Sequence, residues 1–395
     1  MSISLHQRIT NILKYNPIVY PLYRFVFSLF IKALRLFVKT DQKLIFFNSY
    51  AGRKFNDSPK AIFDVLKKDQ RFREYKLVWA FHEPDDFSVD GAEKIKTDGL
   101  NYFLTALSAR VWITNSSFER GLNFTGKNTF YFNTWHGTPL KKMGTDLPQG
   151  NTAFSQKGRT SFDKMMSQGR FETDIYSRSF SIPSEKFLEV GLPRNDVLAH
   201  YTMTERQRIR ENLGIRSDQI VILYCPTYRE YTKDKNHGVI MEPPMNLKKW
   251  EDELGGDYVL LLRAHYEVSK VMEIQENGFV RNMTFYPDLN DLYIAADILI
   301  SDYSSVFFDY SITGKPMLHF AYDYEEYSSK RGLYFDIREY VNGASDEDRL
   351  ILKIKTMNVD DERERTHRFQ EKFVEFYGNA SQAAVDCIAK ELGIF

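Results

Sequence analysis

The sequence predicts an α/β fold built from two similar units of parallel sheet. Short apolar runs alternate with helical patterns along the chain, which is typical of strands connected by helices. This series begins again near residue 205, after a junction at residues 195–205. The length of 395 residues also exceeds one ordinary domain and suits two. We therefore expect two facing Rossmann-like domains, with ligands held in a cleft at the carboxyl ends of their strands.

Each expected strand is a short apolar run. In the first unit the runs lie at residues 43–47, 76–81, 111–114 and 130–133, and in the second at 220–224, 258–263, 298–301 and 316–319. Expected helices lie at 100–109, 204–213, 289–295, 304–313 and over the last thirty residues. Another helix opens at Ser58-Pro59, with a capping serine and a proline in its first turn. No GxGxxG motif follows the first strand, so a dinucleotide-dependent oxidoreductase is not supported.

The composition excludes several classes of protein. The 53 Lys and Arg residues balance the 53 Asp and Glu residues, so the overall charge does not favour nucleic-acid binding. The two cysteines, Cys225 and Cys387, allow one disulfide at most and fit a reducing compartment. HExxH and paired CxxC motifs do not occur, and Asp288 and Asp291 flank a helix start, where carboxylates usually act as caps. We expect neither a metal ion nor another cofactor.

Residues 1–40 combine positive charge with many apolar side chains. They contain six Lys and Arg residues but no Asp or Glu. Their longest uncharged run, near residues 25–31, is far shorter than the roughly 20 residues that cross a bilayer. Since no small-residue cleavage site follows, a signal peptide is not expected. We expect a basic amphipathic segment that lies on an anionic membrane; the alternative is a helix packed on the protein's own surface.

Residues 133–142 contain the most informative motif. The expected strand at 130–133 leads into the sequence TrpHisGlyThrPro at 135–139, so His136 lies at the carboxyl end of a strand where the chain turns. An imidazole in this place can exchange a proton near neutral pH. Two lysines follow at 141–142, either beside a phosphate or simply in solvent. From its position alone, His136 fits a structural role as well as a catalytic one.

Arg263 and His265 mark a second candidate site. They stand at the end of the expected strand 258–263 and share one face of an extended chain, so both could hold a phosphate. The alternative is a pair of Arg263 with a carboxylate beside a packed histidine. The stretch at 225–229 follows a strand, and the stretch at 191–196 lies at the junction and contributes Arg194.

Ser304 and Ser305 form a third candidate site. They follow the expected strand at 298–301 and open a helix, whose free amides and dipole favour an anion such as a pyrophosphate. Asp309 lies one turn further on and could accept a hydrogen bond from a substrate hydroxyl. The alternative is N-capping of the helix by Ser304 or Asp302.

Together these motifs resemble the CDP-glycerol glycerophosphotransferase family of teichoic-acid synthesis, which includes primases and polymerases of glycerol phosphate or ribitol phosphate. The resemblance covers roughly residues 43–340, and five motifs in one order make it highly specific. The motifs are TrpHisGlyThrPro at 135–139, GlyLeuProArgAsnAsp at 191–196, CysProThrTyrArg at 225–229, ArgAlaHis at 263–265 and AspTyrSerSer…Asp at 302–309 with Ser301 before it, joined by GlyLysPro at 314–316 and ArgGlyLeuTyrPheAsp at 331–336.

The resemblance implies a GT-B-like fold, a metal-independent transfer and a peripheral membrane protein. It implies that His136 and His265 are catalytic. The substrate-binding residues that it implies are Trp135, Gly137, Thr138, Pro139, Arg194, Pro226, Thr227, Arg263, Ala264, Ser304, Ser305 and Asp309. Ala264 and Tyr266 depart from the residues that relatives often show there, which affects fine substrate contacts. The large N-terminal region of the family's long polymerases is missing, so we expect a single transferase module.

The expected reaction transfers glycerol phosphate from CDP-glycerol to a polyprenyl-diphosphate-linked acceptor, releasing CMP at the cytoplasmic face of the cell membrane. His136 is the expected base, and His265, Arg263 and the helix end at 304–305 hold the pyrophosphate; the reverse assignment of the two histidines stays open. We expect a membrane-association segment at 1–40, an acceptor domain at 41–200 and a CDP-alditol-binding domain with a terminal helix at 201–395.

Three alternatives to this function stay open. The donor could be CDP-ribitol, the protein could be a GT-B glycosyltransferase that uses a nucleotide sugar, or it could be a non-catalytic, membrane-bound polymer-binding protein. The motifs also leave open whether one unit or many are added, which polymer is made, and the oligomeric state.

Overall fold

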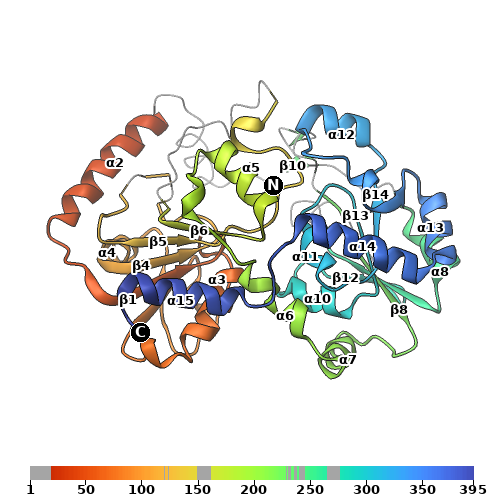
Figure 1. The fold of residues 1–395 in the computed structure, drawn as a ribbon, viewed down its shortest axis with the longest axis horizontal. Helices are drawn as coiled ribbons and strands as arrows, with labels where there is room; N and C mark the ends of the chain where they lie inside the picture. The colour runs from red at the N-terminus through yellow and green to blue at the C-terminus, as the bar shows by residue number, and fades with distance from the viewer. Residues whose placement is uncertain are drawn as a thin grey trace. The chain divides into compact units, whose positions relative to one another are not determined.

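The computed structural model describes residues 19–119, 121–122, 124–148, 162–227, 229, 233–234, 238–239, 245–264 and 276–395. They form two compact units, whose helices and strands are labelled in Figure 1. The first unit extends to His136 and includes Ser161–Met165 and Ala384–Phe395; the second comprises Gly137–Thr160 and Met166–Ala383. Each unit contains parallel strands covered by helices, which confirms the predicted α/β class.

The first sheet has seven strands in the order β3-β2-β1-β4-β5-β6-β7. All pairings from β3 to β6 are parallel, so the carboxyl ends of these strands meet at one edge. The strands are β1 (Asp41–Asn48), β2 (Lys76–Phe81), β3 (Glu93–Lys96), β4 (Ala109–Thr114), β5 (Phe130–Asn133), β6 (Lys164–Ser167) and β7 (Phe187–Glu189).

Aromatic side chains bury both faces of this sheet. Phe46 packs on Tyr102 of α4 (Leu100–Ser108), with ring centroids 5.6 Å apart. The next residue, Phe47, packs on Phe63 of α3 (Asp57–Leu66), with centroids 5.5 Å apart. Because successive strand residues point to opposite faces, α3 and α4 cover opposite faces of the sheet. Such burial on both sides explains why the strands are continuous apolar runs.

The helix α2 (Val19–Arg35) also belongs to the first unit. Its Ile31 is fully buried, whereas five other apolar side chains are more than half exposed: Leu22, Phe25, Val26, Leu29 and Phe30. Among the helices that the structure describes, none has both the length and the apolarity that a membrane crossing needs.

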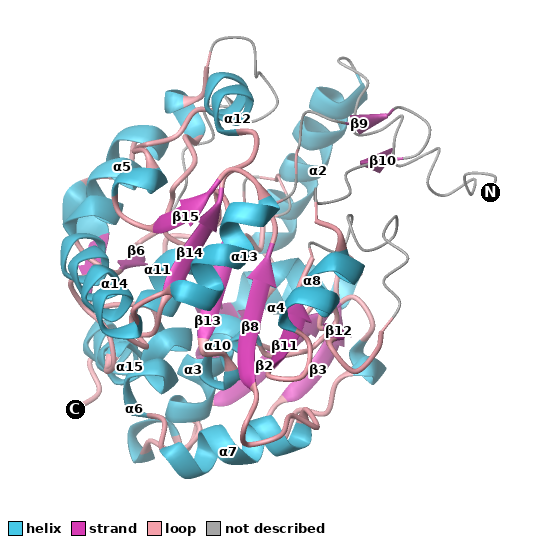
Figure 2. Cartoon of the chain, turned by 90° about the vertical axis from the view of Figure 1, so that its right-hand side faces the viewer, coloured by secondary structure: helices cyan, strands magenta, loops and turns pink. Residues whose placement is uncertain are grey.

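The second sheet has six strands in the order β12-β11-β8-β13-β14-β15, and every pairing is parallel (Figure 2). The strands are β8 (Ile220–Cys225), β11 (Tyr258–Leu262), β12 (Val280–Asn282), β13 (Ile298–Ser301), β14 (Met317–Phe320) and β15 (Asn342–Ala344). A separate antiparallel pair joins β9 (Lys233–Asp234) and β10 (Gly238–Val239).

Two apolar cores sandwich the second sheet. Leu223 and Leu261 belong to one core, and their neighbours Ile222 and Leu260 belong to the other. The first core receives side chains from α7 (Met203–Asn212), α10 (Leu289–Ala295), α11 (Val306–Ser311) and α14 (Val359–Phe373). The second receives them from α8 (Leu247–Leu254) and α13 (Glu347–Thr356). The other helices are α5 (Arg170–Phe180), α6 (Asp196–His200), α12 (Tyr324–Arg331) and α15 (Ala380–Leu392).

All eight predicted strands are present, but two predicted helix starts were wrong. The helix predicted from Ser58 begins at Asp57, after Asn56, so Ser58 lies inside its first turn and is not its cap. The helix predicted at 304–313 is α11, Val306–Ser311, with Ser305 at its N-cap; it ends ahead of Gly314, whose φ of +65° does not continue a right-handed helix. The assignment of an acceptor domain at 41–200 and a donor domain at 201–395 stays a prediction.

Candidate active site

His136 follows the carboxyl end of β5 by three residues, at a turn held by backbone and side-chain hydrogen bonds. Asn133, the last residue of β5, accepts the Trp135 amide at 2.7 Å and donates its side-chain amide to the Ser116 carbonyl at 2.9 Å. The Thr134 amide donates to the Thr114 carbonyl at 2.8 Å. Trp135 has φ +52°, which is rare for a bulky residue. Strained backbone conformations of this kind cluster at functional sites, where contacts with the surrounding residues hold them in place.

The hydrogen bond at His136 Nδ1 defines the tautomer of the ring. Nδ1 lies 2.7 Å from the carbonyl oxygen of Asn115. Because a carbonyl oxygen only accepts, we assign the proton to Nδ1, and the neutral ring then carries its lone pair on Nε2. The Trp135 ring stacks on the imidazole at 4.4 Å, and the side chain of His136 is exposed. The arrangement suits a base that acts through Nε2.

A left-handed turn after β1 lies beside His136. Tyr50 has φ +49° and Ala51 has φ +56°. Their amides donate to Asn115 Oδ1 and Ser116 Oγ at 2.8 and 2.9 Å, and the Tyr50 ring centroid is 6.0 Å from that of His136. The sequence interpretation missed these residues. The polar side chains directly after β1 and β4 could have indicated that these residues lie near His136, because both strands end at the same edge of the sheet as β5.

Gly137 begins the part of the motif that belongs to the second unit. A Cβ at this position would lie 2.8 Å from Ser305 Oγ and 3.9 Å from Arg194 Nη2, so only glycine allows this approach. Thr138 and Pro139 are buried. The structure therefore brings together three motifs that are far apart in the sequence, at 137–139, 191–196 and 302–309.

Asp309 holds two side chains of the 191–196 motif. Arg194 Nη2 donates to its two carboxylate oxygens at 2.9 and 3.2 Å, and Asn195 Nδ2 donates to Oδ1 at 2.7 Å. The side chains of Arg194 and Asp309 are only 10% and 6% exposed, so the ion pair is nearly buried. Asn195 also donates to Gln168 Oε1 at 3.0 Å. The sequence interpretation included Asn195 in its motif without giving it a role and missed Gln168, because this contact depends on the folded chain.

Ser304 and Ser305 precede α11, and Ser305 occupies its N-cap position. Ser304 Oγ accepts the Val306 amide at 3.4 Å, whereas Ser305 makes no capping hydrogen bond with its side chain. The alternative of capping by Asp302 was wrong, because its carboxylate accepts from the Thr227 and Tyr303 amides and from Arg229.

Arg263 and its neighbours only partly fall within the described residues. Arg263 Nη1 donates to the carbonyl oxygens of Met283 and Tyr286 at 3.1 and 2.8 Å. Ala264 is buried, and His265 lies outside the residues that the structure describes. The proposed pairing of Arg263 and His265 on a phosphate therefore stays a prediction.

Comparison with known proteins decides the family. The family model of CDP-glycerol:poly(glycerophosphate) glycerophosphotransferase matches residues 30–390. The chain belongs to this family. The solved structure of the wall teichoic acid polymerase TagF is similar with a TM-score of 0.82 and 31% identity, over 98% of this chain and 97% of that one. The GT-B-like α/β fold implied by the motifs agrees with this likeness.

Two curated relatives from this family differ in length. A teichoic acid poly(glycerol phosphate) polymerase of Staphylococcus epidermidis is 34% identical over 373 residues, which cover 89% of this chain but 51% of the relative. A teichoic acid glycerol-phosphate transferase of Staphylococcus aureus is 30% identical over 370 residues, which cover 89% of this chain and 94% of the relative. The chain thus spans about half the length of the first relative and nearly all of the second.

In this family member the 225–229 motif builds a buried charge cluster. Arg229 is 1% exposed and donates to Asp302 Oδ2 at 2.8 Å and to both carboxylate oxygens of Asp323 at 2.7 and 2.8 Å. Its guanidinium also lies 4.7 Å from the ring centroid of Tyr327. Asp302, with no exposed surface, in turn accepts the amide of Thr227 at 2.9 Å. The cluster therefore fixes the loop that carries Pro226 and Thr227.

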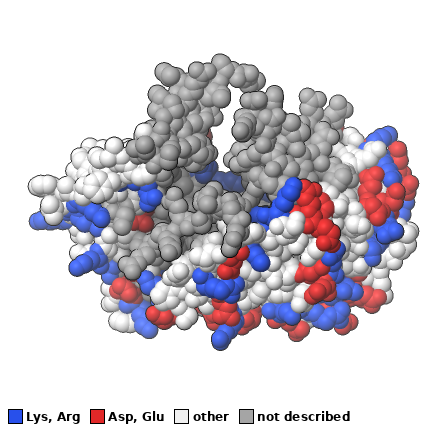
Figure 3. Space-filling model, turned by 90° about the horizontal axis from the view of Figure 1, so that it is seen from above, with Lys and Arg blue, Asp and Glu red and all other residues white. Residues whose placement is uncertain are grey.

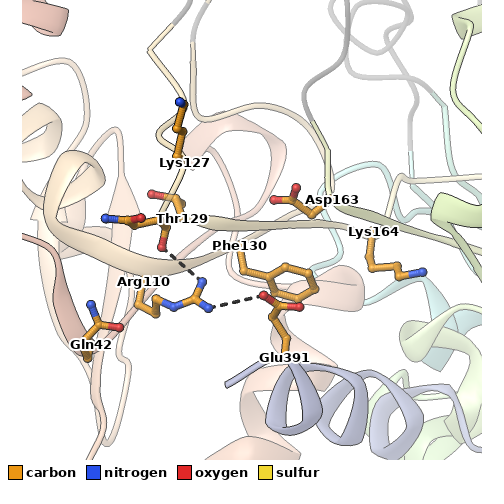
Figure 4. Close-up of a pocket in the computed structure, with 9 residues that line it drawn as sticks. Gln42, Arg110, Lys127, Thr129, Phe130, Asp163, Lys164 and Glu391 are labelled. Atoms are coloured by element: carbon orange, nitrogen blue, oxygen red, sulfur yellow. Dashed lines mark hydrogen bonds and ion pairs between the residues drawn. The ribbon is translucent and has the colours of Figure 1, made fainter. Parts of the chain in front are cut away.

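Among the described residues, no group of three or more His, Cys, Asp and Glu side chains has an arrangement that would hold a metal ion. A pocket of about 490 Å³ lies in the first unit, but at the amino ends of the strands (Figure 4). Arg110 of β4 borders it and donates to the Asn128 carbonyl at 3.1 Å and to Glu391 at 3.4 Å. Since His136 follows a carboxyl end, this pocket is separate from the candidate active site.

Proposed function

We propose that the protein transfers glycerol phosphate from CDP-glycerol to a lipid-linked acceptor in teichoic-acid synthesis and releases CMP. Membership of the glycerophosphotransferase family carries the proposal. Relatives named for glycerol phosphate match at 34% and 30% identity, and a structure of TagF soaked with CDPG is 31% identical to this chain. A teichoic acid poly(ribitol-phosphate) polymerase of Bacillus spizizenii matches at 27%, so CDP-ribitol is the second candidate donor.

In the proposed mechanism His136 acts as the general base. The acceptor hydroxyl gives its proton to Nε2 while its oxygen attacks the β-phosphorus of CDP-glycerol; the phosphoanhydride bond breaks and CMP leaves with the bonding electrons. The tautomer supports this role, because the bond from Nδ1 to the Asn115 carbonyl leaves the lone pair on Nε2. Arg263, His265, Ser304 and Ser305 are proposed to neutralise the pyrophosphate, so that positioning and electrostatics provide most of the catalysis.

The donor prediction is tested by the nucleotide that leaves. Purified protein should release CMP from CDP-glycerol in the presence of a lipid-linked acceptor analogue, and much more slowly from CDP-ribitol. A UDP-sugar serves as the third arm, since a GT-B glycosyltransferase would release a nucleoside diphosphate. Faster release from CDP-ribitol would reassign the donor, and release of a nucleoside diphosphate alone would overturn the proposed chemistry.

We also propose that α2 holds the enzyme on the cytoplasmic face of the cell membrane as a peripheral protein. The exposed apolar side chains of α2, with Phe25 at 64% and Phe30 at 53%, would enter the interface. Arg35, Lys39 and Lys127 line a pocket at the end of the helix and would meet anionic head groups. In Figure 3, the left end of the face, where Figure 1 places α2, is mostly uncharged with blue side chains at its margin.

A double substitution on α2 tests the membrane proposal. Phe25→Glu combined with Phe30→Glu should abolish sedimentation with anionic vesicles. Entry of the helix into the membrane interface would then bury two negative charges, which is unfavourable. The matched control is Leu352→Glu, which replaces an apolar side chain 60% exposed on α13 and should leave sedimentation unchanged. Undiminished sedimentation of the double variant at moderate salt would contradict the role of α2.

A further inference from the structure

Two buried side chains of α5 contact the turn that follows His136, and the proposed mechanism uses neither. Glu172 and Tyr176 lie four residues apart, so they share one face of the helix. Both have no exposed surface. The Tyr176 hydroxyl donates to the Gly137 carbonyl at 2.6 Å, and Glu172 Oε1 lies 3.4 Å from the Thr138 hydroxyl. The buried carboxyl group of Glu172 therefore lies next to the Gly137–Thr138 turn, which also approaches Ser305 and Arg194.

The hydrogen bonds indicate where a proton lies in this cluster. A carbonyl oxygen only accepts, so the single hydroxyl proton of Tyr176 points to Gly137. Tyr176 Oη is also 3.0 Å from Glu172 Oε1. While the Tyr176 proton points to Gly137, this second contact needs Glu172 as its donor and hence a protonated carboxyl group; an ionised Glu172 would accept the Tyr176 proton instead. The other oxygen, Oε2, accepts the amide of Gln168 at 2.5 Å, as the unprotonated oxygen of a carboxylic acid can.

The surroundings of Glu172 favour the neutral form. Burial raises the pKa of Glu172 from 4.5 to about 7, with Asp309 raising it further and Arg194, Tyr176 and the Gln168 amide opposing the rise. These groups come from α5 itself, from the 191–196 motif, from α11 and from the end of β6. The Gln168 side chain completes the cluster by donating to Thr138 Oγ1 at 2.8 Å.

We propose that Glu172, in its protonated form, is a positioning residue that acts through Tyr176 to hold the Gly137–Thr138 turn, which directly follows the proposed base His136 in the chain. The inference rests on the proposed function for its effect on turnover. An ionised Glu172 competes with the Gly137 carbonyl for the single hydroxyl proton of Tyr176 and places a second negative charge near Asp309, so the turn loses its support. Turnover should then decline as the pH rises through the ionisation of Glu172.

A pH profile of Glu172→Gln tests this role. Gln retains an N–H donor for Tyr176 and cannot ionise, so the decline in kcat that the wild type shows above about pH 7 should disappear, while KM for CDP-glycerol stays the same. Tyr176→Phe should lower kcat by about 10- to 100-fold with KM unchanged, because the turn is no longer held. The matched control is Asp174→Asn, an exposed carboxylate on the same helix, which should keep the wild-type profile.

Thermal unfolding separates failure of this inference from failure of the proposed function. A carboxyl group whose pKa is raised on folding stabilises the protein below its unfolded pKa, and the advantage is lost as the pH rises through the folded value. The Tm of the wild type should therefore fall relative to Glu172→Gln between about pH 4.5 and pH 7, whether or not CMP is released. Parallel Tm curves, or an unchanged kcat profile in an active Glu172→Gln enzyme, would overturn the inference.

Discussion

Replacing His136 by Asn should lower the rate of CMP release by about 10²–10⁴-fold, because it removes the basic Nε2 of the proposed general base. Asn retains a donor that can reach the Asn115 carbonyl, now 2.7 Å from Nδ1, so the turn should stay folded. The measurement is steady-state CMP release at saturating CDP-glycerol and acceptor. KM for CDP-glycerol should change little, since the base contacts the acceptor hydroxyl in this mechanism.

The control for this result is His367→Asn. His367 lies on α14 with its side chain 64% exposed, beside Glu371. Its loss should leave the rate of CMP release within about twofold of the wild type. Near wild-type turnover in a folded His136→Asn enzyme would remove His136 from the mechanism and move the role of base to His265.

Replacing Arg229 by Met should destabilise the protein by about 3–5 kcal/mol, the largest effect on stability that we expect from one substitution. The guanidinium of Arg229 is the shared partner of Asp302 and Asp323, whose side chains are 0% and 15% exposed. Without the cation, a buried carboxylate keeps its desolvation cost but loses its compensating charge. The measurement is the free energy of unfolding from urea denaturation.

An exposed ion pair provides the comparison for Arg229. Arg216 contacts Asp218 at 3.0 Å, but the two side chains are 58% and 70% exposed. Arg216→Met should therefore leave the free energy of unfolding close to that of the wild type, because solvent screens an exposed ion pair. Equal stabilities of the Arg229 and Arg216 variants would show that the buried cluster contributes no more than a surface pair.

The strands of the two sheet interiors were predictable because they are continuous apolar runs. The bounds of β5, β13 and α10 agree with those predicted from the sequence. The missed strands lie at or near the sheet edges, as with β3 (Glu93–Lys96) and β15 (Asn342–Ala344), which are short and polar and leave no apolar signal. The helix α5 was missed because its buried face contains Glu172, which breaks the apolar pattern of an amphipathic helix.

Site residues were predictable from the sequence where they belong to a motif that follows a strand. They were not predictable where only the folding of the chain brings them into contact. His136 was identified from its place after β5, and Arg194 and Asp309 from motifs that the structure joins in one ion pair. Asn115 holds His136 with its backbone carbonyl. Every residue type has this group, so the sequence could not indicate the contact. Tyr50 adopts φ +49° without being glycine, so the left-handed turn itself had no marker, although polar residues after β1 and β4 indicated the edge of the sheet where it lies.

The mass of the acceptor product shows whether the protein transfers glycerol phosphate. A synthetic lipid-linked acceptor, incubated with the enzyme and CDP-glycerol, should gain mass in whole units of glycerol phosphate, with one CMP released for each unit added. The same mixture with His136→Asn enzyme should show neither change. CMP release without any gain in acceptor mass would show that water, not the acceptor, attacks the donor. A gain of sugar units when a nucleotide sugar replaces CDP-glycerol would identify a glycosyltransferase instead of a glycerophosphotransferase.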